Sequence, residues 1–173
     1  MKMSGMLSEK NIRDLMKGDA PLITDCIDFD TQLQPNGVDM TLNAVMTIEG
    51  AGRIDFDNSE RRISEHSEMA FDDGGYIHLG PGTYSVKFNE VVHMPKDIAA
   101  LGKTRSSLLR CGACLQTAVW DAGYSGRSES MLIVTNPLGI DLKKNARIMQ
   151  LIFFRLESEG EKLYSGIYQN ENV

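Results

Sequence analysis

The sequence is short of basic residues, and this shortage narrows the classes of protein to which it can belong. Its 18 lysines and arginines stand against 24 aspartates and glutamates, which gives a formal net charge of −6. A large nucleic-acid-binding face needs a basic excess, so we expect no nucleic acid as a partner. A small anionic ligand is compatible with this charge, because it needs only a few arginines in one pocket.

Cysteines and long apolar runs are scarce as well. The three cysteines, Cys26, Cys111 and Cys114, are too few and odd in number for a disulfide framework, which favours a reducing compartment. The N-terminal segment MKMSGMLSEKN has no apolar stretch of the kind found in secretory signals. The longest apolar runs, MLIV and LIFF, are far too short to span a bilayer, so we expect no membrane partner. These observations predict a cytoplasmic protein.

Helical periodicity is also rare, and most of the chain has the period of a β-strand. We expect one helix in LSEKNIRDLMKGD, with Ser8 as its N-cap and Gly18 at its end. A second short helix is expected in SSLLRCG, ended by Gly112. The 173 residues suit a single domain, 1–173, with a polar and flexible C-terminal tail over about 158–173.

The remaining segments read as short strands separated by turns. GVDMTL and TYSVKF alternate between apolar and polar residues, so Asp39 and Thr41 share the polar face of one strand. ARIMQLIFF and SMLIVT are nearly continuous apolar runs, which predicts strands buried on both faces. The turn signals QPNG, DDGG, GPG and NPLG lie between such runs. This pattern predicts a mostly β sandwich or barrel.

Two short motifs are excluded by their surroundings. GKT at 102–104 lacks the glycine that a phosphate-binding P-loop needs five residues earlier, where Asp97 stands. CGAC at 111–114 has no paired partner ligands for a structural zinc site and no βαβ setting for a redox pair. Zinc-dependent base deaminases also need P-C-x-x-C, and the residue before Cys111 is Arg110. We therefore interpret Cys111 and Cys114 as small half-buried thiols.

The segment RSSLLR carries the chemistry of a phosphate site. Ser106 and Ser107 stand at the start of the short helix, where backbone N–H groups attract anions and the hydroxyls add donors. Arg105 and Arg110 add full charges that match phosphate oxygens. The alternative is a capped helix with solvated arginines, and the segment by itself does not choose between the two.

The segment WDAGYSG reads as a hairpin turn with an acid and an aromatic. The carboxylate of Asp121 beside bound phosphates can orient and deprotonate a water. The ring of Tyr124 offers a flat face for a sugar or a base. The alternative is an aspartate that caps the turn and a tyrosine in the core.

Taken in order, these segments resemble the trimeric dUTPase and dCTP deaminase superfamily, and within it the archaeal-type dUTPases. NGVDMTL is similar to the first motif of the family, with Asp39 at its acidic position, and GKTRSSLLRCG to the second, phosphate-binding motif. QTAVWDAGYSG is similar to the third motif, which holds the catalytic aspartate, and NARIMQLIF to the fourth. The resemblance covers residues 7–169 and implies a distorted β-barrel or jelly roll.

The resemblance implies hydrolysis of dUTP to dUMP and pyrophosphate. Asp121 would orient the attacking water, Tyr124 would pack on the deoxyribose, and backbone groups from Gln116 to Val119 would read the uracil. The phosphates would be bound by Arg105, Ser106 and Ser107. Mg²⁺ would be held mainly by the triphosphate itself.

The resemblance also implies a homotrimer with its active sites between subunits, so Arg110 would serve a neighbour's site. In the fourth motif, strand alternation puts Arg147 and Gln150 on opposite faces unless a bulge intervenes. We expect Gln150 at the phosphates and Arg147 as a structural partner. Asp39 would either support the metal through water or pair with an arginine.

Two other functions stay open. A dCTP deaminase, alone or combined with dUTPase activity, needs a glutamate on the strand after the turn, and alignment places Leu132 or Ile133 there. The nearest acid is Glu129, which we expect elsewhere along the strand. TAVWDAGY also has the dUTPase spacing, one residue shorter than the corresponding deaminase stretch.

The tail keeps the deaminase alternative open, because it lacks the glycine-rich arm of the familiar dUTPases. It resembles the shorter deaminase tail, with Tyr164, Tyr168 or Gln169 as candidates for closing the site. The third alternative is a non-catalytic nucleotide-binding jelly roll, in which structural hydrogen bonds would hold Asp121.

Overall fold

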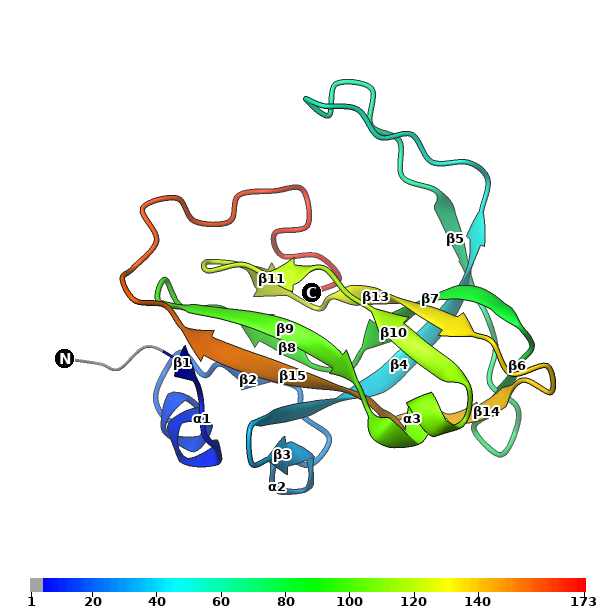
Figure 1. Ribbon diagram of the computed structural model, residues 1–173, viewed down its shortest axis with the longest axis horizontal. Coiled ribbons are helices and arrows are strands. Elements are labelled where there is room, and N and C mark those ends of the chain that lie inside the picture. Colours follow the sequence, from blue (N-terminus) through cyan, green and yellow to red (C-terminus); the bar gives the residue numbers. More distant parts are fainter. Residues whose placement is uncertain (1–4) are drawn as a thin grey trace.

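The computed structural model of the chain describes residues 5–173, and strands dominate its regular structure (Figure 1). The helices are α1 (Glu9–Leu15), α2 (Phe29–Gln32) and α3 (Ser106–Arg110). The strands are β1 (Gly5–Met6), β2 (Ile23–Thr24), β3 (Leu33–Gln34), β4 (Gly37–Glu49), β5 (Glu65–Glu68), β6 (Tyr76–Leu79), β7 (Gly82–Phe88), β8 (Val91–His93), β9 (Ile98–Thr104), β10 (Ala113–Gln116), β11 (Val119–Trp120), β12 (Ser125–Gly126), β13 (Glu129–Val134), β14 (Ile140–Lys143) and β15 (Arg147–Arg155).

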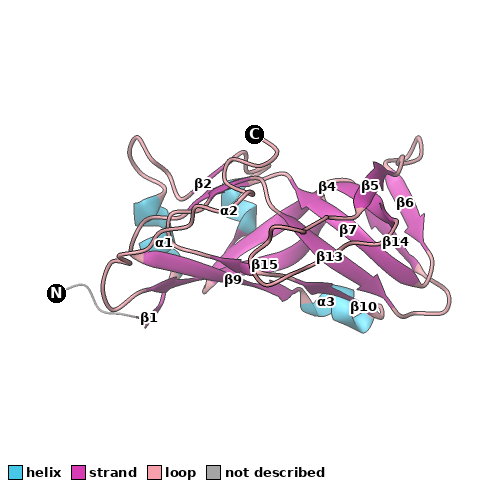
Figure 2. Cartoon of the chain, turned by 90° about the horizontal axis from the view of Figure 1, so that it is seen from above, coloured by secondary structure: helices cyan, strands magenta, loops and turns pink. Residues whose placement is uncertain are grey.

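Most strands belong to one large sheet. Its order is β10-β13-β7-β4-β15-β9-β11, with β1 beside β15 and with β3 and β5 beside β4. Two smaller sheets, β12-β8-β2 and β14-β6, lie beside it. In Figure 2 the strands of the large sheet run along the length of the molecule, with the helices at its periphery. The curled sheet is the jelly roll that the sequence predicts.

Strand β4 connects the two halves of the large sheet. Its residues from Val38 to Thr41 pair with β15, and those from Leu42 to Thr47 pair with β7. The register shifts between Leu42 and Ala44, and such a bulge bends and twists a strand. This bend lets one strand contribute to both halves and curls the sheet. Beyond β4, residues 50–64 form an arm that projects away from the sheets (Figure 1).

Helix α1 begins as predicted, but it ends at Leu15, with Met16 as its C-cap, rather than at Gly18. Helix α2 was not expected. The Ser8 side chain accepts a hydrogen bond from the Asn11 backbone, and the Asn11 side chain accepts one from the Ser8 backbone. Helix α2 ends at Gln32, whose amide donates to Glu90 at 2.7 Å. Glu90 is fully buried, and burial raises the pKa of its carboxyl. This contact lies 58 residues away in sequence, so no local pattern could reveal it.

The expectation for SMLIVT is wrong. In β13, Leu132 and Val134 are buried in the core, whereas Met131 is 38% exposed. The strand is therefore buried on one face, because its other face borders a cavity. In β4, by contrast, the predicted polar face is itself buried, with Asp39 only 1% exposed.

Apolar packing continues through the sheets in one cluster of buried side chains, whose largest fully buried members include Phe88 and Phe153. Among residues 5–173, no helix is long and apolar enough to cross a membrane.

Candidate active site

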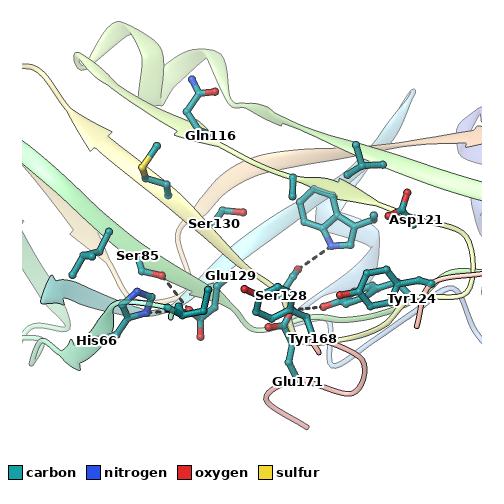
Figure 3. A pocket seen from close by; sticks show the side chains of 17 residues that line it. His66, Ser85, Gln116, Asp121, Tyr124, Ser128, Glu129, Ser130, Tyr168 and Glu171 are labelled. Atoms are coloured by element: carbon teal, nitrogen blue, oxygen red, sulfur yellow. Dashed lines mark hydrogen bonds and ion pairs between the residues drawn. The ribbon is translucent and has the colours of Figure 1, made fainter. Parts of the chain in front are cut away.

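A cavity of about 600 Å³ lies against the hairpin that carries the WDAGYSG segment. We call it the hairpin cavity. Its walls come from this hairpin, the base of the arm and the C-terminal tail (Figure 3). Its volume suits a small molecule. The lining residues are Ile48, Ile63, His66, Ser85, Gln116, Ala118, Val119, Trp120, Asp121, Tyr124, Ser128, Glu129, Ser130, Met131, Tyr164, Tyr168 and Glu171.

Asp121 differs from the other acids of this cavity in having no partner. Its exposed carboxylate makes no hydrogen bond or ion pair within residues 5–173. Glu129 and Glu171, in contrast, are both hydrogen-bonded. Asp121 also lines a second cavity, which shares Asp121 and Tyr164 with the first. A carboxylate in this position is free to bind and orient a water.

The turn that presents Asp121 is held by backbone bonds to the segment after β8. Gly123 donates to the Met94 carbonyl at 3.1 Å, and the Met94 N–H donates to the Tyr124 carbonyl at 2.8 Å. The indole N–H of Trp120, which is only 4% exposed, donates to the Ser128 hydroxyl at 2.9 Å across the hairpin. The position of the Asp121 backbone is therefore set by a rigid scaffold.

Tyr124 lines the cavity from a largely buried position. Its hydroxyl donates to Oε1 of Glu171 at 2.8 Å, and its ring meets Tyr164 edge to face at 5.5 Å. Burial, reinforced by the hydrogen bond to Glu171, raises the pKa of the Tyr124 phenol. Burial also raises the pKa of Glu171. The phenol therefore stays protonated and joins the turn to the tail.

The tail is attached to the turn by further hydrogen bonds. The Gln169 amide donates to the Gly123 carbonyl at 3.0 Å, and its oxygen accepts from the Ser125 N–H at 3.1 Å. The Asn170 N–H donates to the Ser125 carbonyl at 2.7 Å. Of the three residues suggested to close the site, Tyr164 and Tyr168 line the cavity, and Gln169 connects tail and turn. The mobility of segment 158–173 stays a prediction.

Gly123 allows the turn and the tail to approach closely. It has φ +88°, and a Cβ there would lie 2.9 Å from the Cβ of Leu163. We expect Gly123→Ala to lower the free energy of unfolding by about 2 kcal/mol, through backbone strain and displacement of the tail. Urea unfolding and limited proteolysis of the tail measure the two effects.

Gly80→Ala is the matched control, because a Cβ at Gly80 would meet nothing within 4 Å. Its unfolding free energy should stay within about 0.5 kcal/mol of the wild type. A Gly123→Ala chain as stable and as protease-resistant as the control would contradict the close approach described above.

Glu129 lies in the same cavity as Asp121, which the sequence argument did not expect. Its carboxylate accepts hydrogen bonds from the Ser85 hydroxyl at 3.1 Å and the Asn172 amide at 3.2 Å, and it lies 3.4 Å from Nδ1 of His66. Met131, two residues further along β13, shares this face, whereas Leu132 points into the core. The sequence did contain a signal for this placement, because alternation in a strand puts Glu129 on the same face as Met131 and opposite to Leu132.

The predicted phosphate residues do not reach either cavity of their own chain. Arg105, Ser106, Ser107 and Arg110 lie at α3, which is remote from the tail in Figure 1. The two serines and Arg110 are exposed. The structure therefore separates the two groups of residues that the resemblance assigns to one site.

Arg105 is instead one of two half-buried arginines that pair with the buried Asp39. Its Nε lies 3.1 Å from Oδ2 of Asp39, and Arg147 lies 3.3 Å from the same oxygen. Arg147 also donates to the Thr31 carbonyl at 2.9 Å. Of the two alternatives for Asp39, the arginine pairing is the one seen here.

Arg147 and Gln150 of the fourth motif can share a face only if a bulge interrupts the strand. Such a bulge is present in β15, between Arg147 and Met149. Gln150 nevertheless lines neither cavity, and its side chain lies beside Gly37. Gln116, at the end of β10, does line the hairpin cavity.

The described part of the chain builds no metal cage of its own. Within residues 5–173 there is no group of three or more His, Cys, Asp or Glu side chains arranged to hold an ion. Cys111 is exposed and Cys114 is half-buried, and both are free thiols. A site of this kind fits Mg²⁺ only as an ion carried by a ligand's phosphates.

Comparison with known proteins identifies the class of the chain. The model of the dCTP deaminase-like family matches residues 6–156, and the chain belongs to this family. The solved 2'-deoxycytidine 5'-triphosphate deaminase of Agrobacterium tumefaciens has the same fold, with a TM-score of 0.67 over 89% of this chain at 22% identity. The chain spans about half the length (49%) of that deaminase.

Relatives of nearly the same length carry a different name. A Methanococcoides burtonii protein named "Probable deoxyuridine 5'-triphosphate nucleotidohydrolase" is 58% identical over 97% of this chain and 99% of its own. An Archaeoglobus fulgidus protein of the same name is 49% identical over 97% of this chain and 98% of its own. The deoxyuridine 5'-triphosphate nucleotidohydrolase of Methanocaldococcus jannaschii is 38% identical over 80% of this chain and 87% of its own.

Proposed function

We propose that this chain is a dUTP nucleotidohydrolase that converts dUTP and water to dUMP and pyrophosphate. The observation that carries the proposal is Asp121, an unpaired carboxylate on a cavity of nucleoside size. The relatives named deoxyuridine 5'-triphosphate nucleotidohydrolase, which match nearly the whole chain, support the same reaction. The cytoplasm is the location we propose for it.

Asp121 accepts the proton of the attacking water. The water oxygen bonds to the α-phosphorus while the bond from that phosphorus to the bridging oxygen breaks, and pyrophosphate leaves with the electron pair. The exposed and unpartnered state of the Asp121 carboxylate supports this role. Mg²⁺ bound to the phosphates would neutralise the charge that develops on the leaving group.

The hairpin cavity accepts the nucleoside. Its apolar side chains and the Tyr124 ring suit a pyrimidine and a deoxyribose, and exclusion of a 2'-hydroxyl by Tyr124 is part of the proposal. Gln116, Ala118 and Val119 line the cavity, which supports their backbone groups as readers of the uracil edge.

The site requires a second copy of the chain. No lysine or arginine of residues 5–173 lines the hairpin cavity, although dUTP carries several negative charges. Arg105, Ser106, Ser107 and Arg110 of a neighbouring copy supply the phosphate contacts, with Gln150 beside them. We assign Asp39 to holding Arg105 and Arg147 in place rather than to magnesium. A homotrimer with three such shared sites satisfies this requirement.

The two other functions receive less support. Glu129 lines the cavity, as a deaminase acid must, but the relatives that match nearly the whole chain carry the nucleotidohydrolase name. A non-catalytic role would need Asp121 engaged in structural hydrogen bonds, and its side chain makes none within the described residues.

A pyrophosphate assay with Mg²⁺ and separate supplies of dUTP, dCTP, UTP and dTTP tests the proposal. We expect pyrophosphate from dUTP, with a rate on the other three lower by about 100-fold or more. Loss of the cytosine absorbance from dCTP would establish the deaminase alternative, with Glu129 as the acid to replace. The absence of any reaction with all four would favour a binding protein.

A further inference from the structure

Glu90 is an acidic side chain that lies inside the protein, away from the cavities described above. It stands in the connection between β7 and β8, is 0% exposed and lines neither cavity. A carboxylate in such a place is costly unless hydrogen-bond donors surround it. The groups that donate to Glu90 therefore indicate its role.

Two of these donors belong to Thr41 of β4. The Thr41 N–H donates to Oε2 of Glu90 at 2.9 Å, and the Thr41 hydroxyl donates to Oε1. The neighbouring Asn89 N–H donates to the Thr41 carbonyl at 3.0 Å. The connection between β7 and β8 thus binds both backbone groups of Thr41.

The third donor, Gln32, joins Glu90 to Asp39. The Gln32 amide donates to Oε1 of Glu90 at 2.7 Å and to the Asp39 carbonyl at 2.8 Å. The Gln32 side chain is itself held, because its oxygen accepts from the Asp28 N–H at 3.0 Å. Glu90 therefore fixes the backbone of Asp39 through this amide, and that of Thr41 directly.

The strand segment held in this way carries the carboxylate that binds two arginines. Oδ2 of Asp39 lies 3.1 Å from Nε of Arg105 and 3.3 Å from Arg147. Arg105 also donates to the Arg147 carbonyl at 3.1 Å. The position of the Arg105 guanidinium therefore depends on where Asp39 lies.

Regular strand pairing does not fix Asp39 by itself, because the ladder is interrupted nearby. The register of β15 against β4 shifts between Arg147 and Met149, and that of β4 against β7 shifts between Leu42 and Ala44. A bulge disrupts the hydrogen bonds of a ladder locally. The contacts of Glu90 supply fixed points between these two irregularities.

We propose that Glu90 is a positioning residue for Arg105, acting through Gln32 and Asp39. The inference rests on the proposed function, since it takes Arg105 as a phosphate ligand in the site of a neighbouring copy. Glu90 touches no substrate. Its carboxylate holds the backbone of Asp39, which in turn holds the guanidinium in one position before the nucleotide binds. Less conformational freedom is then lost when the phosphates bind.

Glu90→Gln is the variant that tests this role, and the Kd of α,β-imido-dUTP, measured by calorimetry in Mg²⁺ buffer, is the quantity to follow. The amide keeps the size of the carboxylate but replaces one acceptor oxygen by an NH₂ group, which cannot accept from the surrounding donors. We expect the Kd to rise by about tenfold, because a displaced Arg105 loses part of a charge-assisted hydrogen bond. The affinity for deoxyuridine, which has no phosphate, should not change.

A double-variant cycle with Arg105→Gln separates positioning from a merely structural role. In the Arg105→Gln background, Glu90→Gln should raise the Kd by less than about twofold, because the group that it positions is gone. Tyr84→Phe is the matched control. It also removes one hydrogen bond, from the phenol to the Gly80 carbonyl at 3.0 Å, and Tyr84 lines neither cavity. Its Kd should equal that of the wild type.

Gln32→Met applies the same test if Glu90→Gln does not fold. Methionine keeps the length of the side chain and removes the donor to Asp39, while Thr41 still donates to Glu90. This variant too should raise the Kd in the wild-type background and leave it nearly unchanged in the Arg105→Gln background. Urea unfolding shows that each chain compared is folded.

An unchanged Kd, or an equal rise in the two backgrounds, would overturn the inference. So would an equal loss of affinity for deoxyuridine, because it would reflect a general disturbance of the fold. A wild type that shows the expected cycle but releases no pyrophosphate from dUTP would contradict only the hydrolysis. A wild type that hydrolyses dUTP while the two variants act additively would contradict only the positioning role.

Discussion

Asp121→Asn is expected to lower kcat for dUTP by about 1,000-fold, the range in which general bases contribute. The amide keeps the size of the carboxylate but cannot accept a proton from water. Because the Asp121 side chain has no partner within the described residues, the variant should fold as the wild type does. Its affinity for dUTP should therefore be retained, and steady-state kinetics together with calorimetry separate the two quantities.

Asp73→Asn is the control, because Asp73 is an exposed acid in the turn before β6 and lies outside both cavities. Its kcat should equal that of the wild type. If Asp121→Asn kept both its turnover and its affinity, Asp121 would not be the base and the proposed mechanism would fail.

Two inactive variants should restore each other when they assemble together. Arg105→Gln removes a phosphate contact, which typically costs about 100-fold or more in kcat, yet it leaves Arg147 to pair with Asp39. If each site combines Asp121 of one chain with Arg105 of its neighbour, random trimers of Arg105→Gln and Asp121→Asn chains contain about one intact site in four. We therefore expect about a quarter of wild-type activity from an equal mixture, which differently tagged chains and co-purification can measure.

As controls, Arg105→Gln chains alone and Asp121→Asn chains alone are taken through the same reassembly, and both must stay inactive. Mixed trimers that form but recover no activity would mean that Asp121 and Arg105 of one site come from the same chain. Arg105 lines neither cavity of its own chain, which argues against such an arrangement.

The sequence predicted an element correctly where the interactions that form it join residues only a few positions apart. The cap formed by Ser8 and Asn11 involves residues three apart, so α1 could be predicted where it lies. Period-two alternation in GVDMTL predicts a strand, since side chains of a strand point to alternate faces whatever the partner. The DAGYSG turn could be recognised because Gly123 takes a positive φ that glycine favours.

The contacts that depend on distant residues could not be predicted. Helix α2 ends in a hydrogen bond from Gln32 to the buried Glu90, and nothing near Gln32 in sequence announces it. Alignment put Leu132 or Ile133 at the position of the deaminase acid, whereas Glu129 is the acid of this strand that lines the hairpin cavity. An offset of a few residues in a strand decides which face a side chain shares. Gln150, which we expect at the phosphates, lines neither cavity of its own chain, and no local pattern could show this.

By itself, the sequence determined the class of this protein: a mostly β chain with the ordered motifs of the dUTPase and dCTP deaminase superfamily. Those motifs are short segments whose chemistry depends on neighbouring residues. Only the tertiary structure decided which groups share a space. It left Asp121 unpaired on two cavities, held Arg105 on Asp39 and brought Tyr164 of the tail against Tyr124 of the turn. The pairing of strands in a sheet brings together residues that are far apart in sequence, and the conformational preference of a short segment does not determine which residues meet.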